Sequence, residues 1–463
     1  MSESSNKEMK RTEYLPEEVV EYMMSHFLPI QSLLRNRTVA KKFKDMEVLS
    51  RDLDFSRIHS VKRSQSEAID IIESVFNQHK GSEIDRFVLP LDPTGVEDKV
   101  IQWINTCLAK NIEELVLDFS RSKKVLEIPI EFSAIETLRV LSLKWCTFQI
   151  PDNSPKGLKL LRTLELKKTN VTQEMVDAVF NNCIYIASLE LANCQMEGIL
   201  SINAQNRKKF KSLAVYSMPK INNIILNAPT LECYMYHGFV RVIDFSRVDS
   251  LKEAKLHFTK SKSRKSPLSG GWSNHHSFDM LLTNMKVYSK LHVLATTHIF
   301  LQAFTSIGPY EEMREPTYCF RNLQELQIYF RSLYDIAGFL DHCPNLKRVL
   351  ININGFTFEP ETDGAWESYN EQRKYIENHN FEMDSIREVE INGYRGLWGE
   401  LEIVRFFAWN ARFLKELKLV TPRKRKVKLG KFDRMRIDNI EILSLRKGLI
   451  TVVESHQVAP KPE

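Results

Sequence analysis

The sequence is poor in the motifs on which many enzymatic functions depend. Its 463 residues include only 16 glycines, and no Walker-type loop, G-x-S-x-G or H-E-x-x-H motif occurs. The chain therefore offers no phosphate-cradling loop, hydrolase nucleophile elbow or zinc-peptidase helix. Carboxylates are plentiful, but no pair is distinctive. We expect a protein that is not an enzyme and needs no cofactor.

Cysteines are few and scattered. There are seven, and no two are spaced C-x-x-C. This pattern argues against a disulfide framework and a zinc site, and for buried thiols in a reducing compartment. The adjacent His275 and His276 lie in a stretch rich in serine and glycine, without further clustered ligands. No metal site is predicted.

Long apolar runs and a strong charge of one sign are also missing. No segment approaches the ~18 apolar residues of a membrane span, and the polar start MSESSNKEMKRTE does not resemble a signal peptide. The formal net charge of +6 comes from 65 basic and 59 acidic residues, which does not indicate nucleic-acid binding. The basic stretch from Arg423 to Lys428 could be a nuclear import signal, although we favour a solvated loop. We expect localisation in the cytoplasm, the nucleus or both, without a membrane partner.

The chain does contain a recurring frame, L-x-x-L-x-L-x-x-C/N. It is filled by LRVLSLKWC from Leu138, IASLELANC from Ile186 and LKRVLININ from Leu346, with partial copies at Leu161 and Phe210. Successive starts at 138, 161, 186 and 210 are 23, 25 and 24 residues apart, within the leucine-rich-repeat period of roughly 20–29. The two central leucines of each frame point to one side of a short strand. Stacked frames bury that side, so we predict an α/β leucine-rich-repeat solenoid with one short parallel strand plus a helix or loop per repeat.

A short segment dense in apolar residues precedes the repeats. Leu15 and Pro16, followed by Glu17 and Glu18, form a good helix start, and Pro29 breaks the helix. Below about 40 residues a segment rarely buries a core of its own. The repeats or another protein must therefore cover its surplus apolar side chains.

This segment, LPEEVVEYMMSHFLPIQSLLRNRTVAKKFK, resembles the F-box, a small all-helical module. The F-box pattern runs LP-x-E, an aliphatic helix, a Leu-Pro break, a leucine-rich helix and V-S-K-x-W. Ala40 replaces the usual serine, and Phe43 replaces the usual tryptophan. The resemblance implies that adaptor binding involves Leu15, Pro16, Val19, Val20, Met23, Phe27, Leu28, Pro29, Ile30, Leu33, Leu34, Val39 and Phe43. Part of this set can instead pack as ordinary core against the first repeats.

The rest of the chain resembles plant F-box/leucine-rich-repeat/FBD proteins. The likeness is carried by APTLECYMYHG, CPNLKRVLI and REVEINGYRGLWGELEIVRFFAWNARFLKELKL, which includes Gly393, Gly396 and Glu400 in FBD-like order. It implies a substrate-recognition subunit of an SCF-type ubiquitin ligase. The F-box would dock on a Skp-type adaptor joined to a cullin scaffold, and the repeats would bind a protein target.

Frames and resemblance together predict the domain organisation. Two intervals between frames, 251 to 291 and 346 to 386, are 40 residues long and should each contain an insertion. The predicted segments are a disordered tail at 1–11, an F-box at 12–50, a linker and N-terminal cap at 51–110, leucine-rich repeats at 111–380 with insertions near 259–285 and 356–380, FBD-like repeats at 381–449 and a tail at 450–463.

The outward residues of the strands are the candidates for target binding. Early repeats carry small or charged residues there, whereas the middle repeats offer aromatic, methionine and histidine side chains; aromatic residues and methionine are enriched at interfaces. The candidate target-binding residues are Tyr216, Met235, His237, His257 and Tyr329. A solvated strand face without function is the alternative for each. Two other functions stay open, a repeat scaffold not coupled to ubiquitin transfer and a small-molecule receptor, although no basic pocket can be recognised in the sequence.

Overall fold

The structure is a computed structural model. It describes residues 48–58, 64–128, 136–147, 158–259, 284–305, 319–329, 333–353, 374, 376–379, 381, 383–422, 437–440 and 448–454. The predicted F-box up to residue 47, most of both predicted insertions and the basic stretch from Arg423 to Lys428 lie outside the described residues. The chain forms two compact units, Met1–Asn170 with Asn181–Ile186, and Val171–Phe180 with Ala187–Glu463.

The first unit contains a ladder of parallel strands. In order they are β1 (Asp52–Asp54), β2 (Arg86–Pro90), β3 (Glu114–Asp118), β5 (Val140–Lys144) and β7 (Thr163–Lys167). Leu115 and Leu117 of β3 are fully buried, and they lie beside Leu141 and Leu143 of β5. The frame leucines thus form the core as predicted, and the ladder already begins at β1. Two short strands, β4 (Leu126–Glu127) and β6 (Cys146–Thr147), pair separately.

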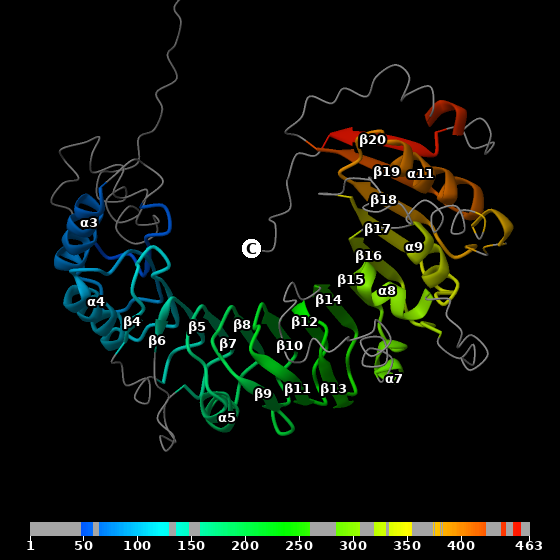
Figure 1. The fold of residues 1–463 in the computed structure, drawn as a ribbon. Helices are drawn as coiled ribbons and strands as arrows, with labels where there is room; N and C mark the ends of the chain where they lie inside the picture. The colour runs from blue at the N-terminus through cyan, green and yellow to red at the C-terminus, as the bar shows by residue number, and fades with distance from the viewer. Residues whose placement is uncertain are drawn as a thin grey trace, which may run out of the picture. The chain divides into compact units, whose positions relative to one another are not determined.

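Two helices pack at the start of this ladder, α3 (Gln65–Gln78) and α4 (Glu97–Ala109) (Figure 1). A capping box begins α3, because the Ser64 hydroxyl accepts from the Glu67 N–H while the Glu67 carboxylate accepts from the Ser64 N–H. Phe76 stacks on Trp103 at 5.9 Å between centroids and meets Phe87 of β2 edge to face at 5.5 Å. These rings join both helices to the sheet.

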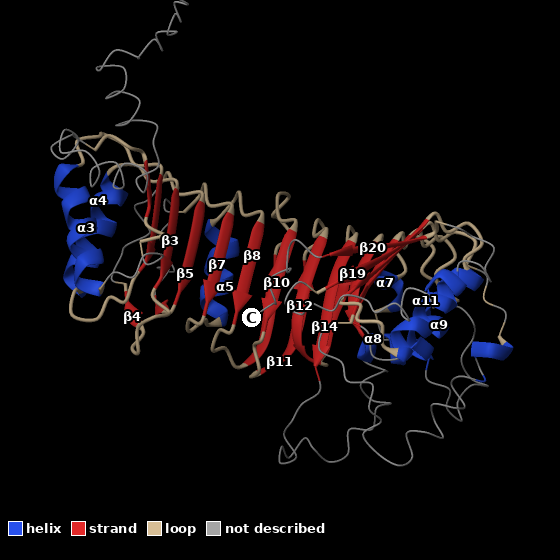
Figure 2. Ribbon diagram, turned by 90° about the horizontal axis from the view of Figure 1, so that it is seen from above, coloured by secondary structure: helices blue, strands red, loops and turns tan. Residues whose placement is uncertain are grey.

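The second unit repeats the same plan over ten parallel strands, which run side by side in Figure 2. They are β8 (Ser188–Ala192), β10 (Ser212–Tyr216), β12 (Cys233–Phe239), β14 (Glu253–Thr259), β15 (Val293–Thr297), β16 (Glu325–Tyr329), β17 (Arg348–Asn352), β18 (Glu388–Asn392), β19 (Glu416–Thr421) and β20 (Ile450–Glu454). The α/β repeat prediction is confirmed. The predicted tail at 450–463 needs correction, because Leu417 to Thr421 pair with Ile450 to Glu454.

A second layer covers one side of this sheet. Behind the later strands lie helices, α8 (His298–Thr305), α9 (Leu333–Leu340) and α11 (Trp398–Asn410), whereas the earlier repeats carry short strands instead, β9 (Gly198–Asn203), β11 (Ile221–Asn227) and β13 (Val242–Arg247) (Figure 1). Two further helices are α5 (Gln173–Asn182) and α7 (Met285–Tyr288). The extra strands follow from period-two alternation, since Leu200, Ile224 and Phe245 turn inward and are at most 1% exposed. Phe245 meets Tyr234 edge to face at 5.1 Å, which joins the two layers.

The segment with FBD-like order forms a tight turn into α11. Gly393 and Gly396 have φ angles of 88° and 81°, which favour glycine. The Glu400 side chain is fully buried, and its Oε2 accepts from the N–H groups of Arg395 at 2.6 Å and Leu397 at 3.2 Å. The glycines and the glutamate therefore shape one helix start. Among the described residues, no helix is long and apolar enough to span a membrane.

Candidate protein-binding face

The face of the second unit's main sheet opposite the helices is called the open face. Along strands such as β14 buried residues alternate with partly exposed ones, and the partly exposed residues form the open face. In β10 and β15 the central outward residues are the small Ala214 and Ala295, which are buried as well. Because the strands are parallel and in register, equivalent residues line up across repeats. Tyr216 lies beside His237, and His237 beside His257. Their strands β10, β12 and β14 are neighbours in the sheet (Figure 2). The ladder therefore places three of the predicted target-binding residues in one row.

Methionine extends this row toward the middle of the strands. Met235 lies beside Ala214 of β10, and the hydroxyl of Tyr216 donates to its Sδ at 3.2 Å. The small Ala214 leaves room for the thioether to approach the tyrosine hydroxyl. Tyrosine and methionine thus share one partly exposed, adaptable surface.

The two histidines and Tyr329 form the other half of the row. His257 lies 6.4 Å from His237 and 4.7 Å from Tyr329, measured between ring centroids, and both pairs are edge to face. Tyr329 is on β16, so its ring reaches His257 across β15. The residue between them on β15 is Thr297, whose hydroxyl donates to the Phe258 carbonyl at 3.1 Å. We call the five residues Tyr216, Met235, His237, His257 and Tyr329 the aromatic patch.

The aromatic patch is uncharged near neutral pH. Burial, the neighbouring His237 and Lys255 lower the pKa of His257 from 6.5 to about 4. Burial also lowers the pKa of His237. Nearby Lys255 pairs with Glu253 at 3.0 Å. A partner would therefore meet two neutral imidazoles, two phenols and a thioether.

One polar atom of the aromatic patch has an unmet hydrogen-bonding capacity. Nε2 of His257 is buried and has no hydrogen-bond partner among the described residues. A buried polar atom left unpaired costs roughly 1–3 kcal/mol. Tyr329, which is 37% exposed, covers the same imidazole. A partner that moves the Tyr329 ring and offers a polar group could satisfy this nitrogen.

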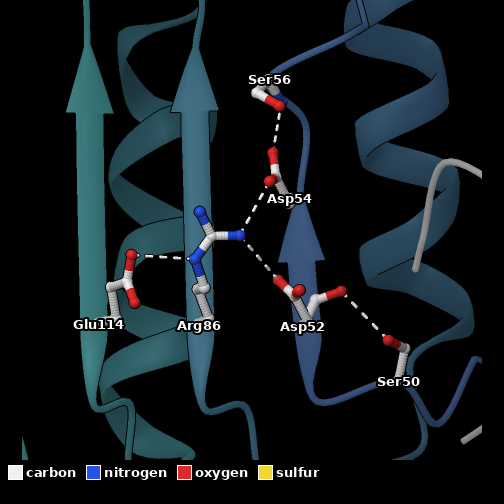
Figure 3. A network of polar contacts seen from close by, with 6 residues as sticks. All are labelled: Ser50, Asp52, Asp54, Ser56, Arg86 and Glu114. Atoms are coloured by element: carbon white, nitrogen blue, oxygen red, sulfur yellow. Dashed lines mark hydrogen bonds and ion pairs between the residues drawn. The ribbon is translucent and has the colours of Figure 1, made fainter. Parts of the chain in front are cut away.

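The outward face of the first unit differs in chemistry, because it is charged. Arg86 of β2 binds Asp54 at 2.8 Å and Asp52 at 3.3 Å through Nη1, and Glu114 at 2.9 Å through Nε (Figure 3). Although burial opposes it, hydrogen bonding to Asp54 and Glu114 raises the pKa of Arg86. Burial raises the pKa of Asp52. The three carboxylates share one cation, Arg86, so the network links neighbouring strands of the sheet. It offers little apolar surface to a partner.

The structure brings together all five residues that the sequence predicted for target binding. Thr297 also belongs to this surface, because it lies between His257 and Tyr329 on β15. Its role cannot be predicted from the sequence, since it depends on a contact between two other strands. The thirteen residues predicted for adaptor binding, from Leu15 to Phe43, lie outside the described residues. Their role stays a prediction.

Comparison with known proteins gives matches over most of the chain. A family model described as "At1g61320/AtMIF1, LRR domain" matches residues 75–456. The FBD-associated F-box protein At1g61320 of Arabidopsis thaliana is 51% identical over 433 residues, covering 92% of each chain. The putative FBD-associated F-box protein At1g61330 of the same plant is 49% identical over 434 residues, covering 92% of this chain and 94% of its own. The F-box/FBD/LRR-repeat protein At1g13570, also from that plant, is 22% identical over 408 residues, covering 85% and 86%.

Proposed function

The chain belongs to the F-box/FBD/leucine-rich-repeat family represented in Arabidopsis thaliana, and on that premise we propose that it is the substrate-recognition subunit of an SCF-type ubiquitin ligase. The F-box binds a Skp-type adaptor and, through it, a cullin scaffold. The repeats bind a protein target. In this proposal the chain contributes proximity between target and ubiquitin donor, while other subunits carry out the chemistry.

The observation that carries the proposal is the order of modules. An F-box pattern from Leu15 to Phe43 precedes a repeat array, and a relative named for an F-box is 51% identical over 92% of this chain. The lack of catalytic motifs agrees with a non-catalytic subunit. We further propose localisation in the cytoplasm, the nucleus or both, where such adaptors and reduced thiols are found.

The aromatic patch is the proposed target-binding site. Its five side chains come from four strands and adjoin one another, so they can form the continuous core of an interface. Tyrosine is enriched among the residues that dominate binding energy, since it supplies a large rigid surface and a polar group. The charged network around Arg86 lacks this combination, which is why we assign the target to the second unit.

Co-purification with a Skp-type adaptor tests the proposal. The intact chain should co-elute with the adaptor, and the double variant Leu15→Ala/Pro16→Ala should not. The matched control is Ile184→Ala/Tyr185→Ala, which trims two exposed apolar side chains (46% and 42% exposed) of the first unit and should keep adaptor binding. A well-folded intact chain that fails to bind the adaptor would select the alternative function, a repeat scaffold not coupled to ubiquitin transfer.

A further inference from the structure

The residues that immediately precede the strands of the second unit form a continuous row, here called the entry rim. The N–H of Lys347 donates to the Gln324 carbonyl at 2.9 Å, and the N–H of Arg387 donates to the Lys347 carbonyl at 2.8 Å. The same link joins each earlier and later member, from Lys211 to Lys415. The backbones of successive rim residues are therefore about 4.8 Å apart, the spacing of paired strands.

Charges on the early part of the entry rim compensate one another. Glu232 binds Lys211 at 2.6 Å on one side and Lys252 at 3.0 Å on the other. The equivalent row of the first unit does the same, where Arg139 binds Glu113 at 3.1 Å. Lys211, Lys252 and Arg139 thus each have a carboxylate on the neighbouring strand.

The rim in front of β15 to β18 lacks such pairs among the described residues. It borders a groove of about 360 Å³, called the rim pocket, whose charged lining residues are Arg321, Lys347 and Arg387. The other lining residues are a histidine, a glutamine, two asparagines and a serine. No carboxylate lines the pocket within the described chain, and neither Arg321 nor Lys347 forms an ion pair with a described residue. Three cations therefore face one groove without a counter-charge among its described lining residues.

The nearest strand carboxylates are already engaged. Glu325 and Glu388 begin β16 and β18, and both bind Arg348 of β17 between them, at 3.4 and 3.6 Å. Arg348 belongs to the open face, whereas Lys347 precedes the strand. These glutamates consequently neutralise a different cation.

One cation of the rim pocket is held in place. Nη1 of Arg387 donates to the carbonyls of Asp384 at 2.5 Å and Ile386 at 3.1 Å, and its guanidinium lies 5.3 Å from the ring centroid of Phe413. The Asn345 amide donates to the Arg321 carbonyl at 2.8 Å, which ties two neighbouring loops together. A guanidinium fixed in this way loses little freedom on binding an anion.

We propose that the rim pocket binds a phosphate monoester, carried either by a small molecule or by a phosphorylated side chain. Such a group has a charge of about −1.5 to −2 and three strong acceptor oxygens at neutral pH. Two arginines and a lysine match this charge, because guanidinium groups bind phosphate bidentately. The volume lies at the lower end of the range of roughly 300–1,000 Å³ for ligand pockets, which suits a single polar group. This inference goes beyond the ligase function and does not depend on it.

Calorimetric titration of the intact chain tests the proposal, with phosphoserine, a short phosphoserine peptide and the same peptide unphosphorylated as probes. At a constant ionic strength of about 0.15 M, which screens distant charges, only the two phosphorylated probes should bind. Lys347→Gln/Arg387→Gln should weaken both at least about tenfold, because two charge-assisted contacts are lost. The control Lys211→Gln/Lys220→Gln removes the same charge elsewhere in the unit and should keep the affinity. Arg321→Gln should also weaken binding of both phosphorylated probes. Because Arg321 is exposed, this variant should fold without repacking of its neighbours.

The outcomes separate the two sources and can overturn the site. Much tighter binding of the peptide than of free phosphoserine assigns the phosphate to a modified protein, and similar affinities assign it to a small molecule. The proposal fails if the folded chain binds neither phosphorylated probe. It also fails if the control pair loses affinity as much as Lys347→Gln/Arg387→Gln. Tighter binding of a random RNA oligonucleotide that none of the rim variants weakens would likewise overturn it.

Discussion

His257 of β14 and Tyr329 of β16 touch edge to face, with ring centroids 4.7 Å apart, although β15 runs between their strands. Two strands separated by a third are about 9.6 Å apart, so these side chains must lean toward each other over β15. Thr297 permits this because its side chain is short and its hydroxyl bonds the Phe258 carbonyl. The contact makes one surface out of two repeats.

Replacing Tyr329 tests whether that surface binds the target. Tyr329→Ala should remove target capture and leave the fold intact, because the side chain is 37% exposed and its ring contacts His257 at the surface. The measurement is affinity purification under proteasome inhibition, comparing the proteins retained by each variant. Tyr185→Ala removes a tyrosine of similar exposure (42%) in the first unit and serves as control. An unchanged set of retained proteins in Tyr329→Ala would place the target elsewhere.

His257 should make the stability of the second unit dependent on pH. Its pKa falls from 6.5 to about 4 on folding, chiefly through burial, so the unfolded chain binds the proton first as the pH drops. The contribution to stability is thus fully present above pH 6.5 and is lost as the pH falls toward the folded pKa, by about 1–3 kcal/mol. Thermal unfolding from pH 7 to 4 should show a smaller loss in His257→Leu than in the unchanged chain. Equal slopes in both proteins would contradict the assignment.

The strands of the repeat frames could be predicted because the residues that specify each strand lie within a single frame. Alternation of leucines such as Leu141 and Leu143 specifies both a strand and its buried side, and the parallel ladder then aligns all outward residues. For the same reason the five residues of the aromatic patch could be named without a structure. The strands β9, β11 and β13 of the second layer could not be predicted, because alternating stretches as short as GILSIN do not differ enough in sequence from loops.

Features built from several repeats could not be predicted. The rim pocket draws Arg321, Lys347 and Arg387 from loops far apart in sequence. Each is an ordinary exposed or half-exposed cation within its own repeat, and it is distinguished only by the lack of a carboxylate among the described residues that line the groove. The contact between His257 and Tyr329 over the short side chain of Thr297 likewise depends on three strands together.

Arg86 should be needed to hold three carboxylates on the first unit's sheet. Arg86→Gln leaves Asp52, Asp54 and Glu114 without their shared cation. We expect a loss of about 1 kcal/mol in the free energy of unfolding, a modest value because the side chain is 33% exposed. The loss should shrink at about 1 M salt, where the Debye length is only about 3 Å. Lys99→Gln, which breaks one exposed pair with Glu73, is the control in the same thermal unfolding series and should show less than half this effect. A salt-independent loss in Arg86→Gln would point to packing instead of charge.

Glu400 should be the residue on which the start of α11 depends. Its Oε2 accepts from two backbone N–H groups, those of Arg395 and Leu397, inside a fully buried site. Glu400→Leu keeps the apolar volume but leaves both donors without an acceptor, which should cost about 2–4 kcal/mol. Glu400→Gln should cost less, since its amide oxygen can still accept from both. Fluorescence of Trp409, near the end of α11, reports local unfolding in each variant.

The titration of the Glu400 carboxyl group should also make the stability of the second unit depend on pH. Burial raises the pKa of Glu400 above 4.5, against the lowering effect of the N–H groups of Arg395 and Leu397. The folded chain therefore binds the proton more tightly than the unfolded chain, so the contribution of this group to stability falls as the pH rises from 4.5 through the folded pKa. Glu400→Gln has no such titration, and the difference in stability between it and the unchanged chain should vary with pH in that interval alone. A constant difference would mean that the carboxylate is charged throughout, and the helix start would then depend on its charge as well as on its two hydrogen bonds.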